Sequence, residues 1–246
     1  MRRKVITQIG SLPYEDISEA VKYSLKHDIP FLPELPKRGE AMLDYIKNPG
    51  KLSCLDEFKN AIRGYETVKI QCVGPATLRL NRYSKEEAIG RAYEHISGML
   101  DGINAKEIVL FLDEPALGQV LFDYKQDWNE LFETLAVEPG LDNLVLGVHT
   151  CGNIDWDQLF DSNIEIISFD ASKYNIIETS TKYRNGKRIA WGVNSKKDVK
   201  DFQEGDLLTL PCGIGTSAYK VENCDKYLRM LRRVSREIIT QPRISL

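Results

Sequence analysis

The chain has 246 residues, enough for one large domain or two small ones, with a net charge of −3 and a pI near 5.8. This balance lacks the basic footprint of a nucleic-acid-binding protein, so we expect no nucleic-acid partner. No apolar run approaches the roughly 18 residues needed to span a membrane, and the basic N-terminus lacks the apolar segment of a signal peptide. The five scattered cysteines are untypical of a disulfide framework and favour a reducing, cytoplasmic location.

Short apolar runs of strand character alternate along the chain with patterns of helical period. The runs predict strands near residues 4–9, 29–35, 67–73, 107–113, 144–149, 164–169, 187–193 and 206–212. The helical patterns predict helices near residues 15–27, 84–104, 126–137 and 223–239. The second of these helices should begin with a capping box, because Ser84 is followed three residues later by Glu87.

Eight strands that alternate with helices within about 250 residues are typical of a (β/α)8 TIM barrel, an α/β fold. We therefore predict a single barrel domain over residues 1–246, since no long linker, repeat or low-complexity stretch divides the chain. A doubly wound open sheet is the alternative. It is less favoured because no G-x-G-x-x-G motif follows the first strand.

Polar residues gather where the predicted strands end. In chain order they are Gly10-Ser11, Pro33-Glu34, Cys72-Val73-Gly74-Pro75, Asp113-Glu114-Pro115, His149-Thr150-Cys151, Asp170, Asn194 and Cys212-Gly213. In a barrel all of these strand ends open onto one face, where active sites are built. The sequence therefore predicts one functional site at that face.

Four of these residues have the donor atoms of a metal site. His149 and Cys151 are two apart on a strand, so their side chains should project to the same face. Alone this pair is a weak signal, because free cysteines are commonly buried core residues. Asp170 and Cys212 end two further apolar strands and add an oxygen and a second sulfur. Nitrogen, oxygen and two sulfur donors that converge from three strands predict a zinc site.

Other polar residues have simpler readings that stay open. Asp113-Glu114-Pro115 is also typical of a strand that ends before a turn, because proline disfavours helix in the residue before it. Glu34 lies between two prolines and could be a solvated loop carboxylate. Cys72 alternates with apolar neighbours, which favours a buried thiol. A basic stripe in the last helix is typical of a solvated face, with docking of an acidic partner as the alternative; it comprises Arg229, Arg232, Arg233 and Arg236.

Taken together, these motifs resemble the catalytic C-terminal barrel of cobalamin-independent methionine synthase. The matching segments follow the order of the family along nearly the whole chain. They are Gln8-Ile-Gly-Ser-Leu-Pro13, Pro33-Glu34, Glu40-Ala-Met42, Gly74-Pro-Ala-Thr77, Asp113-Glu-Pro-Ala-Leu117, His149-Thr-Cys151, Ile167-Ser-Phe-Asp-Ala-Ser172, Gly192-Val193 and Cys212-Gly213. The resemblance implies that His149, Cys151 and Cys212 bind zinc. It also implies that the amino acid part of homocysteine is bound by Gly10, Ser11, Glu34 and Asp113, with Asp113 also expected to act in catalysis.

The chain departs from this family in three ways. Asp170 replaces a glutamate ligand and is one methylene shorter, so it is expected as a labile fourth ligand or as a neighbour of a water. Asn194-Ser195-Lys196-Lys197 stands where the family has a histidine proton donor. The large N-terminal half that helps to bind the folate donor in the family has no counterpart in this sequence.

The expected function is zinc-dependent transfer of a methyl group to a small-molecule thiol, with homocysteine giving methionine. The chain is also similar, more loosely, to zinc methyltransferases that work with corrinoid proteins, so a methyl-corrinoid, carried by a partner protein, is the expected donor. Two alternatives stay open: a zinc hydrolase on the same barrel, and a non-catalytic metal-binding subunit of a methyltransferase system. Binding of the thiol sulfur to the metal would distinguish them.

Overall fold

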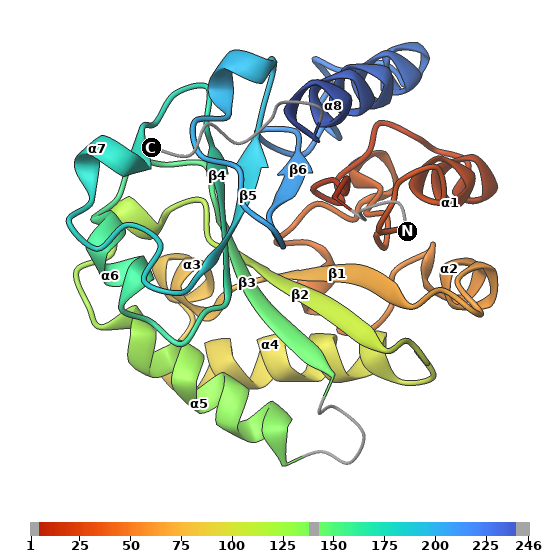
Figure 1. Cartoon of the computed structure of the whole chain (residues 1–246). Helices are drawn as coiled ribbons and strands as arrows, with labels where there is room; N and C mark the ends of the chain where they lie inside the picture. The colour runs from red at the N-terminus through yellow and green to blue at the C-terminus, as the bar shows by residue number, and fades with distance from the viewer. Residues whose placement is uncertain (1–4, 138–142, 240–246) are drawn as a thin grey trace.

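The computed structural model describes residues 5–137 and 143–239, and a sheet of six parallel strands forms its centre (Figure 1). The strands follow one another across the sheet in chain order. They are β1 (Thr67–Val73), β2 (Glu107–Asp113), β3 (Leu144–Thr150), β4 (Ile166–Asp170), β5 (Arg188–Gly192) and β6 (Leu207–Thr209). Because all six strands are parallel, their carboxyl ends meet at one edge of the sheet.

The prediction of a TIM barrel is confirmed only in part: the fold is α/β with a curled parallel sheet, but the eight-stranded barrel is incomplete. The segments predicted as strands at 4–9 and 29–35 make isolated parallel bridges instead; Lys4 lies outside the described residues. The first segment bridges β6, with Thr7 N donating to Leu208 O at 3.1 Å, and the second bridges β1, with Lys69 N donating to Pro30 O at 2.7 Å. The two segments therefore lie in the gap between β6 and β1.

Local chemistry explains why these two segments do not form continuous ladders. The second contains Pro30 and Pro33 and is followed by Pro36, and proline has no N–H to donate to a neighbouring strand. In the first segment, Ile6 N donates to the side chain of Asp28 at 3.2 Å, so a carboxylate replaces a neighbouring strand as its acceptor. The hydrophobic pattern of these two segments therefore predicted continuous strands where the structure has only isolated bridges.

Helices surround the sheet, with α4 and α5 beside one another along one side of it (Figure 1). They are α1 (Ile17–Ser24), α2 (Leu55–Ala61), α3 (Pro75–Leu80), α4 (Lys85–Leu100), α5 (Tyr124–Ala136), α6 (Trp156–Phe160), α7 (Ile176–Thr179) and α8 (Cys224–Ile239). Short 3-10 turns are η1 (Pro36–Arg38), η2 (Tyr45–Lys47), η3 (Leu117–Gln119), η4 (Lys196–Asp198) and η5 (Val221–Asn223). The four predicted helices are confirmed as α1, α4, α5 and α8, and Ser84 and Glu87 form the predicted capping box. In the described part of the chain, none of the helices combines the length and the apolar character that a membrane crossing needs.

Alternation along the strands divides the buried side chains into two groups. The outer group fills the layer between sheet and helices and includes Val68, Ile70 and Cys72, so the predicted burial of the Cys72 thiol is confirmed. The inner group lies on the opposite face of the strands. It consists of Ile9, Ile29, Val109, Phe111, Ile166, Ala190 and Leu207. Since this group takes residues from both N-terminal segments as well as from the strands, those segments help to enclose the interior of the sheet.

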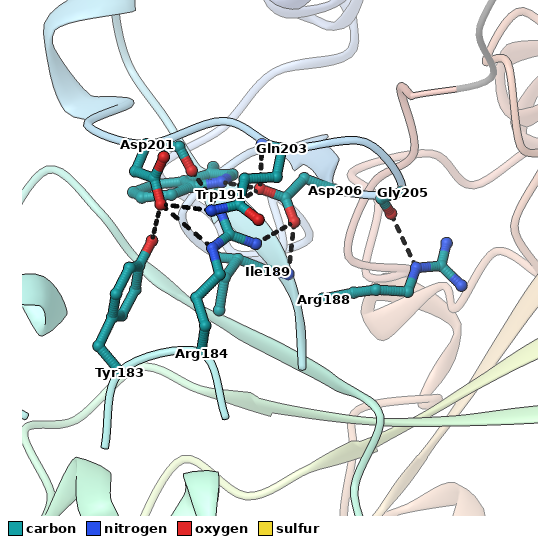
Figure 2. Close-up of polar contacts among 9 residues, drawn as sticks. All are labelled: Tyr183, Arg184, Arg188, Ile189, Trp191, Asp201, Gln203, Gly205 and Asp206. Atoms are coloured by element: carbon teal, nitrogen blue, oxygen red, sulfur yellow. Dashed lines mark hydrogen bonds and ion pairs between the residues drawn. The ribbon is translucent and has the colours of Figure 1, made fainter. Parts of the chain in front are cut away.

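A buried ion-pair network fastens the amino end of β5 to the segment before β6 (Figure 2). Both terminal nitrogens of Arg184 donate to the carboxylate of Asp206 at 2.7 Å. The same carboxylate accepts from Ile189 N and from Trp191 Nε1, each at 2.9 Å. Asp206 is fully buried, and these charged and neutral donors satisfy both of its oxygens. The network therefore secures strands whose opposite ends carry the functional site.

Candidate metal and substrate site

The predicted metal ligands His149, Cys151 and Cys212 come together at the carboxyl ends of the strands. His149 Nε2 lies 3.2 Å from Cys151 Sγ, and Cys151 Sγ lies 3.2 Å from Cys212 Sγ. All three donor atoms lie within 4.8 Å of one another. His149 is on β3, Cys151 follows the end of that strand, and Cys212 follows β6, so two segments distant in the sequence supply one cluster.

A second side chain fixes the orientation of the imidazole. Nδ1 of His149 lies 3.0 Å from Oγ of Ser168, which sits directly beside it on β4. This contact occupies one ring nitrogen and leaves Nε2 facing the two cysteines. Histidines that bind metals in proteins generally have such a hydrogen-bonding partner on the other nitrogen.

The donor set and its spacing fit zinc. In a tetrahedral zinc site with bonds of about 2.0–2.3 Å, neighbouring donors lie roughly 3.3–3.8 Å apart, so the spacings of 3.2 Å need only small side-chain adjustments. Both cysteines are free. The two sulfurs lie within hydrogen-bonding distance, and this contact lowers the pKa of the Cys212 thiol and raises the pKa of the Cys151 thiol. The pair thus already stabilises one thiolate, the form that binds metals.

Asp170, the fourth predicted ligand, lies outside this group of three. Its Oδ1 accepts from the hydroxyl of Ser172 at 2.5 Å, and its Oδ2 forms an ion pair with Lys173 at 3.0 Å. Asn194 stands where the family resemblance expects a histidine, and its side-chain amide donates to Ser172 at 3.2 Å. The carboxylate of Asp170 is therefore held by its own neighbours along the chain, and its role as a zinc ligand stays a prediction.

The metal cluster opens into a pocket of about 330 Å³ at the same end of the strands. The pocket is lined by Ile9, Ser11, Glu34, Pro36, Ala41, Met42, Gln71, Asp113, Pro115, His149, Cys151, Cys212, Gly213, Gly215 and Thr216. Three of the predicted substrate-binding residues, Ser11, Glu34 and Asp113, are thus brought together with the cluster. The fourth, Gly10, does not line the pocket and instead donates its N–H to Gln71 Oε1 at 2.6 Å.

Two buried carboxylates in the pocket each have an unpaired oxygen: Oε1 of Glu34 and Oδ1 of Asp113. Glu34 is 3% exposed and Asp113 is 7% exposed. Burial raises the pKa of Asp113 to about 6, while the charges of His149 and Lys69 oppose that rise. Burial, followed by the charge of Asp113, raises the pKa of Glu34 well above its usual range. Two buried acceptors of this kind favour a cationic donor.

Glu114 has a different role from its neighbour Asp113. Its oxygens accept from the backbone N–H groups of Ala76 and Thr77 at 3.0 and 2.7 Å and from the indole of Trp128 at 3.0 Å. These bonds fix the start of α3. The motif Asp113-Glu114 therefore divides between the pocket and the framework: Asp113 ends β2, as the strand-end reading expects, and also lines the pocket, and its functional role stays a prediction.

Two residues of the site were missed by the sequence reasoning: Lys69 and Gln71 on β1. Their side chains lie on the inner face of the strand, where Lys69 donates to Gln71 and Gln71 donates to Asp113. The signal was present, because two polar residues at i and i+2 interrupt an otherwise buried apolar strand.

Fold and site together define an α/β protein with a His/Cys/Cys cluster at the carboxyl edge of a curled parallel sheet. Neither the comparison with protein-family models nor the search of curated proteins gives a match. Among solved structures, the chain is similar to a methyltransferase from Methanosarcina mazei, with 16% sequence identity and a TM-score of 0.51. The likeness covers 84% of this chain and 71% of that one. At this identity it shows a methyltransferase-like fold, and the resemblance to methionine synthase stays a prediction.

Proposed function

We propose that this protein is a zinc-dependent methyltransferase that transfers a methyl group to the sulfur of homocysteine and so forms methionine. One observation carries the proposal: the His149, Cys151 and Cys212 cluster opens into the same pocket as the unpaired oxygens of Glu34 and Asp113. A substrate with a thiol at one end and an ammonium group at the other matches both parts of that pocket. The methyltransferase-like fold supports the proposal without specifying the substrate.

The zinc site would act on the substrate thiol. A free thiol has a pKa of about 8.5 and reacts poorly near neutrality, and bound zinc supplies the chemistry that favours its thiolate form. Cys151 and Cys212 would contribute two negative charges to the site, which limits how strongly the sulfur is deactivated. In the transfer, a bond forms between the sulfur and the methyl carbon while the bond from carbon to the donor breaks and its electron pair stays with the donor.

The residues of this chain would bind and align the amino acid. Glu34 and Asp113 would accept hydrogen bonds from its ammonium group, and the Ser11 hydroxyl would donate to its carboxylate. Gly215 provides space for that hydroxyl, since a Cβ at this position would overlap Ser11 Oγ. Alignment of the sulfur with the incoming methyl group is a larger part of such a reaction than acid–base help.

For the donor, we propose a methyl-corrinoid carried by a partner protein. Short connections support this part: only five residues separate β4 from α7, and three separate β5 from η4. Short loops leave little of the chain to enclose a large free donor, whereas a carrier protein can cover the pocket itself. The arginine stripe on α8 is a second candidate contact for such a carrier. Methyl transfer from methylcobalamin and from methyltetrahydrofolate polyglutamates, compared in single turnovers, tests this choice.

The zinc-loaded protein tests the proposal as a whole. We expect about one zinc per chain, a sulfur ligand added to the zinc X-ray absorption spectrum with homocysteine, and methionine formed with one of the donors. Cys212→Ser should lose zinc and activity, whereas the matched variant Cys54→Ser, at a buried cysteine of the core, should keep both. An unchanged zinc spectrum at saturating homocysteine would contradict the proposal. Hydrolysis without thiol binding would instead favour a zinc hydrolase.

A further inference from the structure

Lys69 is a charged residue buried inside the sheet, next to Gln71, which lines the pocket. It is fully shielded from solvent, and its ammonium group lies 4.6 Å from the centre of the Phe111 ring. It donates a hydrogen bond to Oε1 of Gln71 at 2.7 Å. A buried lysine is unfavourable unless it is paired and hydrogen-bonded, so the position calls for a role.

The contacts of Lys69 fix the orientation of Gln71. The amide oxygen Oε1 accepts from Lys69 Nζ and from Gly10 N at 2.6 Å. Both partners can only donate, so the side-chain amide cannot turn over without facing its NH2 group toward two donors. Its Nε2 must therefore point to the other side, where it donates to Oδ2 of Asp113 at 2.8 Å.

This orientation determines what the pocket can bind. Because Gln71 presents a donor, Asp113 must act as an acceptor, and its second oxygen is left unpaired, as is Oε1 of Glu34, which lines the same pocket. When Glu34, Asp113 and Lys69 are all ionised, they carry a net charge of −1, and burial disfavours this state by raising the pKa of both carboxyl groups. One primary ammonium group from a ligand would neutralise that charge and supply hydrogen bonds to both free oxygens.

Lys69 keeps its charge beside the two carboxyl groups. Burial lowers the pKa of Lys69 to about 8, and the charges of Asp113 and Glu34 oppose the fall, so Lys69 is a cation at neutral pH. Burial and the charge of Asp113 raise the pKa of Glu34, and the charge of Lys69 opposes that rise.

We propose that Lys69 is a positioning residue that acts through Gln71 and makes the pocket selective for substrates with a primary ammonium group. The inference deepens the proposed function and depends on it for the thiol end of the substrate. Lys69 does not itself contact the substrate. It orients the side-chain amide of Gln71, and that amide in turn orients the carboxylate of Asp113.

The test compares two thiols on zinc-loaded protein: homocysteine and 4-mercaptobutanoate, which is the same molecule without its amino group. The dissociation constants are measured by calorimetry for the wild type, Lys69→Met, Lys69→Arg and Gln71→Met. We expect the wild type to bind homocysteine at least about tenfold more tightly than the analogue, equivalent to one ammonium interaction of ordinary strength. Lys69→Met and Gln71→Met should reduce this ratio to about one while the affinity for the analogue stays similar.

Two further variants separate positioning from a general loss of structure. Lys69→Arg keeps a cationic donor and should restore part of the ratio. Lys106→Met, at a lysine whose side chain is 80% exposed, should leave the ratio unchanged. Zinc content and circular dichroism confirm that each variant is folded, and Gln71→Met provides the test if Lys69→Met is not.

The outcomes distinguish the two levels of the argument. If the wild type binds both thiols equally, the ammonium pocket of the proposed function is wrong. If the wild type prefers homocysteine and either folded variant, Lys69→Met or Gln71→Met, keeps the full preference, the role of Lys69 is wrong and the proposed function stands.

Discussion

Replacement of Arg184 by methionine should destabilise the protein, because it removes the ionic partner of the buried Asp206 carboxylate. Arg184 is 12% exposed at its side chain and Asp206 is 1% exposed, so the variant would leave the Asp206 charge in the interior without its partner. Loss of one member of a buried ion pair costs about 3–5 kcal/mol. Asp206 would keep three neutral donors, namely Ile189 N, Trp191 Nε1 and Gln203 N, each at 2.9 Å, which places the expected loss near the lower end, about 3 kcal/mol.

Urea unfolding followed by circular dichroism measures this loss, and for a chain of this size the melting temperature should fall by about 6–12 °C. The matched control is Arg188→Met, since Arg188 contributes a hydrogen bond to Gly205 O at 2.8 Å in an exposed setting (Figure 2). That variant should lose at most about 1 kcal/mol. Zinc content of the folded Arg184 variant should be unchanged, because the network lies at the opposite end of β5. Equal losses in the two variants would refute the reasoning.

Three further predictions concern the site and the pH dependence of stability. Asp170→Asn should retain about one zinc per chain by metal analysis, because Asp170 is held by Ser172 and Lys173; loss of the metal would show that it is a ligand. Ser168→Ala should weaken zinc binding about 10–100-fold in chelator competition with the fold intact, since it removes the partner of the His149 ring. Burial lowers the pKa of His27 from 6.5 to about 4. The unfolded chain therefore binds more protons between those values, and this contribution to stability, about 3 kcal/mol, is present above pH 6.5 and lost as the pH falls to 4. In His27→Gln the unfolding free energy should fall less over that window, and an identical pH profile would contradict the assignment.

The grouping of His149, Cys151 and Cys212 could be predicted from the sequence because it follows from general properties of parallel strands. Alternation puts His149 and Cys151 on one face of a strand, and parallel strands bring their carboxyl ends, including the one before Cys212, to one edge. The same rules placed Glu34 and Asp113 near the cluster. These inferences needed only strand order and direction, which the hydrophobic pattern supplies.

The remaining features of the site and the fold depend on which residues become neighbours in the folded chain. The hydrophobic pattern of the sequence does not reveal these neighbours. Asp170 is held by Ser172 and Lys173, two and three residues further along the chain, and the position of a carboxylate at a strand end did not indicate these contacts. Lys69 is a polar residue within an apolar strand. Its role depends on contacts with Gln71 and through it with Asp113, and these residues come together only in the folded sheet. The prolines between residues 30 and 36 interrupted a segment whose hydrophobicity was that of a strand.

Strand register connects all parts of the site. Asp113 lies directly opposite His149 in the pairing of β2 with β3, and His149 lies opposite Ser168 in the pairing of β3 with β4. A slip of one residue in either pairing would turn the partner to the other face of the sheet. Asp113, His149 and the Ser168 hydroxyl that orients its ring therefore occupy one row across three strands. The backbone ladder sets their mutual positions, and side-chain contacts such as that of His149 with Ser168 then fix their orientations.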